Sequence, residues 1–119
     1  MKKLIESDKY SILFEYEKVF LCIKNTEKTI LIGEFYGDPY ASLISKNEDF
    51  CVVAGEGLII YYLNEPFYEY NNDETKHQQW KEWGRESDNN TVWIEKIEQI
   101  EAKKIRITTE SDEIIEIDV

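Results

Sequence analysis

The sequence predicts a mainly β (α+β) protein, with a single twisted antiparallel sheet or half-barrel and one short helix near residues 73–83. Apolar and polar residues alternate with period two over much of the 119-residue chain, which is typical of strands with one buried face. Gly, Pro, Asn and Asp cluster between these segments, as they do in turns. Strand and helix patterns do not alternate as a parallel βαβ fold requires. We expect one domain spanning residues 1–119.

The first 36 residues predict a three-stranded meander. Residues 10–16 alternate between Tyr, Ile and Phe on one side and more polar residues on the other. Residues 19–24 and 29–35 form two further apolar segments, separated by the polar, turn-like stretch 25–28. Residues 37–39 read Gly-Asp-Pro and end the ladder, because proline has no backbone donor.

The middle of the chain predicts the centre of the sheet. Residues 40–45 fit either a strand or a helical turn. Residues 50–54 (FCVVA) and 58–63 (LIIYYL) are nearly continuous apolar runs, which indicates strands buried on both faces. Between them Gly-Glu-Gly at 55–57 is a natural tight connection.

The last third begins with a long polar stretch, residues 71–90. Asn72 or Asp73 is suited to cap a short helix there, and Gly84 to end it. Strand character returns over residues 91–100, 104–109 and 113–119. The last two of these segments flank Glu-Ser-Asp, which indicates a hairpin.

Charge restricts the classes of partner. The chain carries 25 acidic and 14 basic residues, for a formal net charge of −11. Nucleic acids and anionic membranes both require a basic surface, so we expect neither as a direct partner. A cationic protein partner is favoured because opposite fields accelerate encounter. The alternative is that the charge serves solubility alone.

Catalytic and metal-binding patterns are scarce, and the sequence predicts no enzyme, no catalytic residue, no metal and no cofactor. The single histidine, His77, lies in a polar stretch away from the two cysteines. Cys22 and Cys51 lie in apolar, core-like segments, and their spacing with one histidine matches no zinc site. The sequence leaves open whether the two cysteines pair.

Aromatic and acidic residues gather in the segment 56–83, where we expect a partner-binding surface. Rigid rings are efficient interface anchors, and carboxylates around them pair with Lys or Arg. The candidate residues are Glu56, Glu65, Glu69, Tyr70, Asp73, Glu74, Trp80 and Trp83. Alternatively, the rings close one end of the sheet and the acids are merely solvated. A second acidic stretch, residues 110–119, fits either a partner or the protection of an edge strand.

Residues 33–63 carry a resemblance to a known class of protein. The features are Gly33, the Tyr-Gly-Asp-Pro of residues 36–39, Ala41 with Ile44, and Gly-Glu-Gly-Leu at 55–58 before a Tyr-containing apolar strand. The segment resembles small immunity proteins of bacterial toxin–immunity pairs, including those of contact-dependent growth inhibition. The resemblance implies a cytoplasmic, non-enzymatic protein that occludes the basic active-site cleft of one cognate toxin domain, often a nuclease such as a tRNase or RNase. It transfers no contact residues.

Two other functions remain open at this stage. One is a small hydrolase or ligand-binding β domain that uses Glu56 or Glu65 in a pocket. The other is a structural subunit that assembles through strand edges. The start of the chain, MKKLIESDKY, has too short an apolar stretch for a signal peptide, which also favours the cytoplasm. The sequence does not indicate an oligomeric state.

Overall fold

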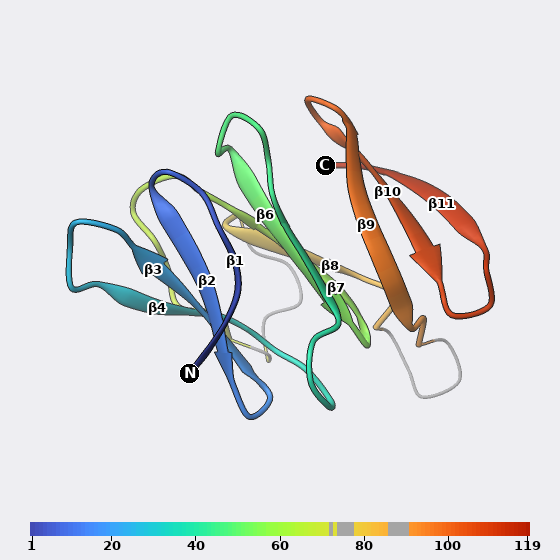
Figure 1. The fold of residues 1–119 in the computed structure, drawn as a ribbon, viewed down its shortest axis with the longest axis horizontal. Coiled ribbons are helices and arrows are strands. Elements are labelled where there is room, and N and C mark those ends of the chain that lie inside the picture. The colour runs from blue at the N-terminus through green and yellow to red at the C-terminus, as the bar shows by residue number, and fades with distance from the viewer. Residues whose placement is uncertain (72, 74–77, 86–90) are drawn as a thin grey trace.

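The structure is a computed structural model that describes residues 1–71, 73, 78–85 and 91–119. Over these residues the chain forms eleven strands in three antiparallel sheets and no helix. The mainly β prediction is therefore confirmed, whereas the single sheet is replaced by three. Figure 1 shows the sheets side by side, with the central sheet between the other two.

The N-terminal sheet is a meander with the strand order β1-β2-β3-β4. Its strands are β1 (Lys2–Glu6), β2 (Tyr10–Glu15), β3 (Lys18–Ile23) and β4 (Thr29–Glu34). The last three confirm the predicted meander. β1 is not among the predicted strands. It is short, starts with two lysines and pairs with β2 through a register shift.

The central sheet has the order β5-β6-β7-β8. Its strands are β5 (Ala41–Ile44), β6 (Phe50–Gly55), β7 (Gly57–Tyr62) and β8 (Trp80–Trp83). The ambiguous segment near residue 41 is thus a strand. β6 is buried throughout and β7 nearly so, which confirms that the two apolar runs form the middle of a sheet.

The C-terminal sheet has the order β11-β10-β9, with β9 (Ile94–Glu101), β10 (Lys104–Thr109) and β11 (Ile114–Asp118). Both predicted elements, the strand after residue 91 and the final hairpin, are confirmed. On the outer face Arg106 lies between Glu98 and Glu116, 3.2 Å from each carboxylate. The inner face is apolar and covers the central sheet.

Alternation in β6 and β7 divides the core into two layers. One set of side chains packs against the N-terminal sheet: Cys51, Val53, Ile59 and Tyr61. The opposite set packs against Ile94, Ile105 and Ile107 of the C-terminal sheet: Phe50, Val52, Ala54, Leu58 and Ile60. Burial raises the pKa of the Cys51 thiol to about 12. Both cysteines are free thiols, which answers the question of pairing.

The predicted helix near residues 73–83 is wrong where the structure describes this segment. Trp80–Trp83 forms β8, whose residues pair with β7 from Tyr61↔Trp80 to Leu58↔Trp83. The physical reason is the unpaired edge of β7, whose backbone groups gain hydrogen bonds from an added strand. Strand geometry also sends Trp80 into one core layer and Trp83 toward the other. Residues 74–77, the start of the predicted helix, lie outside the described residues.

Two isoleucines of the C-terminal hairpin test whether this sheet is part of the common core. Ile107 is fully buried, whereas Ile114 is 64% exposed. We expect Ile107→Ala to lower the free energy of unfolding by about 2–5 kcal/mol, because the removed methyl groups leave a cavity. The same change at Ile114 is expected to stay within about 0.5 kcal/mol. Urea unfolding monitored by circular dichroism measures both; equal effects would contradict the packing of β10 on the central sheet.

Candidate functional site

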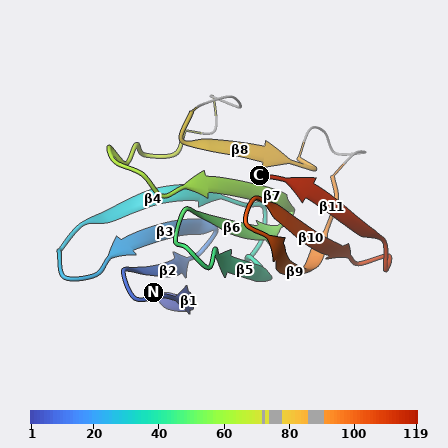
Figure 2. The same cartoon turned by 90° about the horizontal axis from the view of Figure 1, so that it is seen from above.

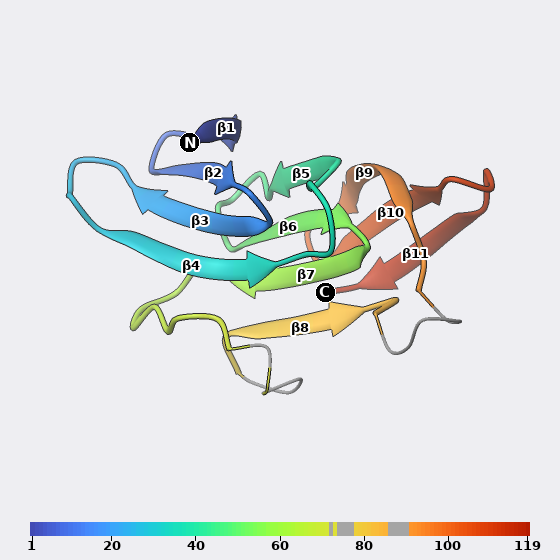
Figure 3. The same ribbon diagram turned by 90° about the horizontal axis from the view of Figure 1, so that it is seen from below.

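One end of the molecule collects the turns that lead out of β2, β4, β6 and β10. Residues 15–17, 36–40, 55–57, 92–93 and 110–113 meet there, and we call this surface the acidic end. It is the lower side of Figure 1, and Figure 3 looks onto it. Antiparallel pairing produces this arrangement, since every second connection of each sheet returns to the same end.

Hydrogen bonds join each turn of the acidic end to the next. The backbone bonds are Phe35 N–H to Glu17 O at 2.9 Å, Tyr40 N–H to Ala54 O at 2.8 Å, Gly57 N–H to Val92 O at 2.6 Å, and Glu110 N–H to Trp93 O at 2.9 Å. The Glu17 carboxylate also accepts a hydrogen bond from the Gly37 N–H. The five segments therefore form one continuous surface across all three sheets.

Exposed aromatic rings concentrate on this surface. Tyr16 is 84% exposed, Tyr36 77%, Tyr40 65% and Trp93 38%. Among the described residues only three other large apolar side chains are comparably exposed: Met1, Tyr68 and Ile114. Rings of this size lose little conformational entropy on binding, so they suit an interface more than a solvated turn.

Charge is also distributed unevenly between the two ends. The segments of the acidic end contain seven acids and no base: Glu15, Glu17, Asp38, Glu56, Glu110, Asp112 and Glu113. At the opposite end, seen in Figure 2, the turns 7–9, 24–28, 45–49 and 102–103 contain four acids and five lysines. The connection 63–79 adds three described acids there, and Lys2 and Lys18 flank the acidic end. Counted over these described residues, the formal charge is still more negative at the acidic end.

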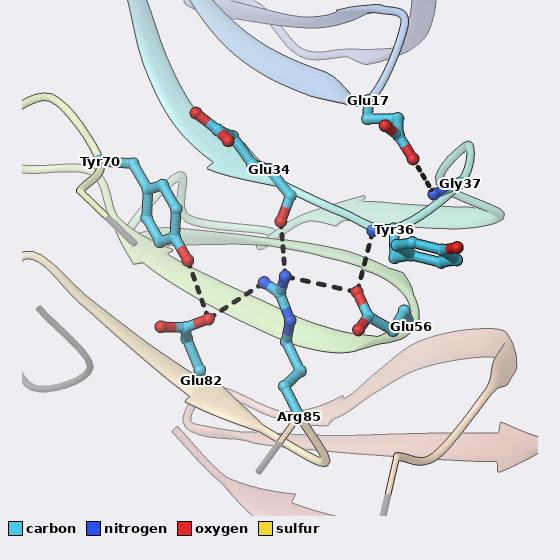
Figure 4. Close-up of polar contacts among 8 residues, drawn as sticks. All are labelled: Glu17, Glu34, Tyr36, Gly37, Glu56, Tyr70, Glu82 and Arg85. Carbon is cyan, nitrogen blue, oxygen red and sulfur yellow. Dashed lines mark hydrogen bonds and ion pairs between the residues drawn. The ribbon is translucent and has the colours of Figure 1, made fainter. Parts of the chain in front are cut away.

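A largely buried arginine lies beneath this surface (Figure 4). The Arg85 side chain, 15% exposed, donates from Nη2 to the backbone oxygen of Glu34 at 2.6 Å. Nη2 also lies 3.5 Å from Glu56 Oε1, and Nη1 lies 3.0 Å from Glu82 Oε1. The Nη1 contact is an ion pair without hydrogen-bond geometry. The guanidinium carbon lies 4.6 Å from the centre of the Phe35 ring.

The two carboxylates around Arg85 extend the network in opposite directions. Glu56 Oε1 accepts a hydrogen bond from the Tyr36 N–H at 2.9 Å, which fixes the turn that carries the exposed Tyr36 ring. Glu82 Oε1 accepts one from the Tyr70 hydroxyl at 2.9 Å. Burial, and then the charge of Glu82, raise the pKa of Tyr70 well above its usual range. Arg85 thus links the acidic end to the core.

The structure separates the seven described residues of the eight that the sequence suggests for partner binding. Tyr70 and Trp80 are buried and pack together, with ring centres 5.4 Å apart. Trp83 is half-buried against the second core layer. These three rings therefore stabilise the fold, as the alternative interpretation of the sequence held for the aromatic residues.

The acids of that set lie in different places. Glu56 is half-buried beside Arg85 at the acidic end. Glu65, Glu69 and Asp73 are exposed on the connection 63–79, and Glu69 accepts a hydrogen bond from the Leu31 N–H at 3.1 Å. Glu74 lies outside the described residues, as does His77. The set therefore does not form one surface.

Sequence reasoning missed the four exposed rings of the acidic end. A signal was present, because Tyr16, Tyr36, Tyr40 and Trp93 all lie just before or after a strand. An aromatic ring at a turn has no strand face to bury it, so it is a better candidate for exposure than one inside an apolar run. From the sequence, the Tyr-Gly-Asp-Pro segment is interpreted as a turn and as part of the resemblance, and not as a contact surface.

No family model, curated protein or solved structure matches the chain. Within residues 1–71, 73, 78–85 and 91–119, no group of three or more His, Cys, Asp or Glu side chains is placed to hold a metal ion. The same part of the chain contains no helix that is long and apolar enough to cross a membrane. Function is therefore argued from the geometry of this chain alone.

Two glycines test how tightly the acidic end is built. Gly57 has φ +67°, and a Cβ there would clash with Cγ of Arg85 and lie 2.7 Å from the Trp83 oxygen. Gly37 has φ +90° with no atom within 4 Å of the added carbon. We expect Gly57→Ala to cost about 2–5 kcal/mol, from crowding added to backbone strain, and Gly37→Ala only about 1–2 kcal/mol. Denaturant unfolding measures the loss in free energy of unfolding for each variant. Similar losses would mean that Arg85 is not held against the turn at Gly57.

Proposed function

We propose that this chain is an immunity protein that binds a cationic toxin domain through its acidic end and blocks the toxin's active-site cleft. The observation that carries the proposal is the coincidence of seven acids and four exposed rings on one continuous surface of the protein. Either feature alone has a simple explanation in solubility or chance. Together they match the composition of an interface, with rigid rings as anchors and charges that set the partner.

The chemistry of the acidic end suits the cleft of a nuclease. Such a cleft binds phosphates with Lys and Arg, and carboxylates are able to take the place of those phosphates. Tyr16, Tyr36 and Tyr40 offer flat apolar faces beside the acids, where nucleobases would otherwise stack. The proposed target is therefore a tRNase, an RNase or a related nuclease, encountered in the cytoplasm.

Preorganisation supports tight binding. The turn at Tyr36 is held by Glu56, which is held by Arg85, and the turn at Glu17 is bonded to Gly37. A surface that is fixed before the encounter loses less entropy on association. This matters for an inhibitor, which must bind faster and more tightly than the toxin's substrate.

The two alternative functions have weaker support in the geometry. Glu56 faces a guanidinium and a backbone N–H, and Glu65 is exposed beyond the far end of β7, so these two carboxylates do not converge on a pocket. Assembly through strand edges is disfavoured at β4, whose Leu31 bonds to Glu69 and Tyr70. At the edge strand β11, the exposed Glu116 and Asp118 oppose pairing with another acidic strand.

Three charge-neutralising variants test the proposal against the toxin domain encoded beside this chain's gene. The first, Glu15→Gln/Asp38→Asn/Glu110→Gln, changes only exposed acids of the acidic end. We expect it to slow association and weaken binding by about tenfold or more at low salt, because steering fields are lost. Surface plasmon resonance at low and high salt measures both rates, and rescue of growth on co-expression gives the biological readout.

A matched control removes the same charge elsewhere. Asp8→Asn/Glu27→Gln/Asp49→Asn lies at the opposite end and shifts the net charge equally, from −11 to −8. It should bind like the unmodified protein. Equal weakening of binding by both triple variants would mean that the acidic end acts only through the net charge of the protein.

A third variant, Glu65→Gln/Asp73→Asn, tests the site expected from the sequence. If this variant alone lost binding to the toxin domain, the interface would lie on the connection 63–79 and not at the acidic end. A neighbouring gene without a cationic toxin domain would contradict the proposed class.

A further inference from the structure

The acidic end contains a shallow hollow beside Trp93. Two segments line it: the residues directly before β9, and the end of β10 with the turn that follows it. The lining residues are Thr91, Val92, Trp93, Thr109, Glu110, Ser111 and Glu113. Its volume is about 270 Å³. The lining contains two carboxylates and no basic side chain, so the hollow differs from the one around Tyr16 on the N-terminal sheet, which includes Lys18.

Trp93 is the most exposed of the three tryptophans, since Trp80 is buried and Trp83 half-buried. Its position is nonetheless fixed by the backbone on both sides. Trp93 forms an isolated bridge with Glu56, and its carbonyl oxygen accepts the Glu110 N–H at 2.9 Å. The backbone that carries the exposed ring is thus held on two sides.

The carboxylates beside the ring are free to bind a cation. Glu110 and Glu113 are exposed and form no ion pair and no side-chain hydrogen bond among the described residues. The hairpin that carries them is ordered by Thr109, whose hydroxyl accepts the Glu113 N–H at 3.1 Å. Acids alone would be satisfied by water, but acids that line the same hollow as an exposed indole form a site with a preferred ligand.

We propose that this hollow binds an arginine side chain of the cationic partner. Arginine stacks its planar guanidinium on an aromatic face while its N–H groups donate to carboxylates, and indole is the best ring for this contact. Lysine makes the charge contact but has no planar group to stack. The hollow therefore favours arginine over lysine, within a surface that elsewhere attracts any cation. This inference rests on the proposed function for the identity of the partner, but not for its test.

The test uses N-acetylarginine amide as the probe, titrated into the millimolar range and followed by NMR of the ¹⁵N-labelled protein. We expect saturable shifts of the Trp93 indole N–H and of the amides of residues 110–113. N-acetyllysine amide should bind about two- to fivefold more weakly, because its ammonium approaches the ring but does not stack on it as a planar guanidinium does. Trp93→Leu, which keeps an apolar side chain but removes the ring, should weaken arginine binding and remove the preference for arginine over lysine.

A second variant guards against local misfolding in Trp93→Leu. Glu110→Gln/Glu113→Gln should weaken arginine binding with the indole signal still in place, whereas the control Asp8→Asn/Glu27→Gln should not. No saturable shift, equal binding of arginine and lysine, or shifts centred away from Trp93 would each overturn the inference. These outcomes are separate from those for the proposed function: the triple variant of the acidic end would still impair toxin binding if the hollow proved not to select arginine.

Discussion

Burial of both faces of the central sheet is the constraint on which the rest of the structure depends. β6 and β7 carry apolar side chains in every direction, so a single covering layer leaves half of them in water. The chain solves this by placing one sheet on each side, before and after the central strands in sequence. The three-layer arrangement follows, and with it the alignment of the turns at two opposite ends. A surface made only of turns is a consequence of this packing.

The buried arginine connects that scaffold to its surface. A guanidinium that is largely removed from water needs carboxylates and carbonyl oxygens around it, because an unpaired charge there would be costly. Glu34, Glu56 and Glu82 supply these groups from three different segments. The same contacts that satisfy Arg85 therefore determine where the turn at Tyr36 lies. The contacts that neutralise the Arg85 charge below the surface therefore also order the turn on the surface.

Sequence reasoning identified the elements whose signal is local. Continuous apolar runs revealed β6 and β7, and alternation revealed β2 and the final hairpin. It failed at β8, where two tryptophans and a glycine fit a helix until the open edge of β7 is taken into account. It also failed to predict three sheets, since the side on which each strand is covered depends on contacts far apart in the chain.

Of the described residues that the sequence suggests for partner binding, Glu56 alone lies at the acidic end. Acids with aromatic rings were expected within residues 56–83, where rings are dense in the sequence. In that segment Tyr70 and Trp80 are buried in the core. The exposed rings belong to three of the five segments of the acidic end, and only the antiparallel registers bring those segments together. No local sequence pattern predicts that these turns meet. A single sequence does indicate that an aromatic ring at the end of a strand is more exposed than one inside an apolar run.

The division between strands and turns has an evolutionary consequence. The segments of the acidic end contribute few side chains to either core layer, so most of their residues are free to change without loss of stability. Tyr16, Tyr40 and residues 110–113 are open to such drift, while Gly57 and Arg85 are not. Descendants of this chain are thus able to diversify their specificity by turn substitutions alone, on a framework that stays constant.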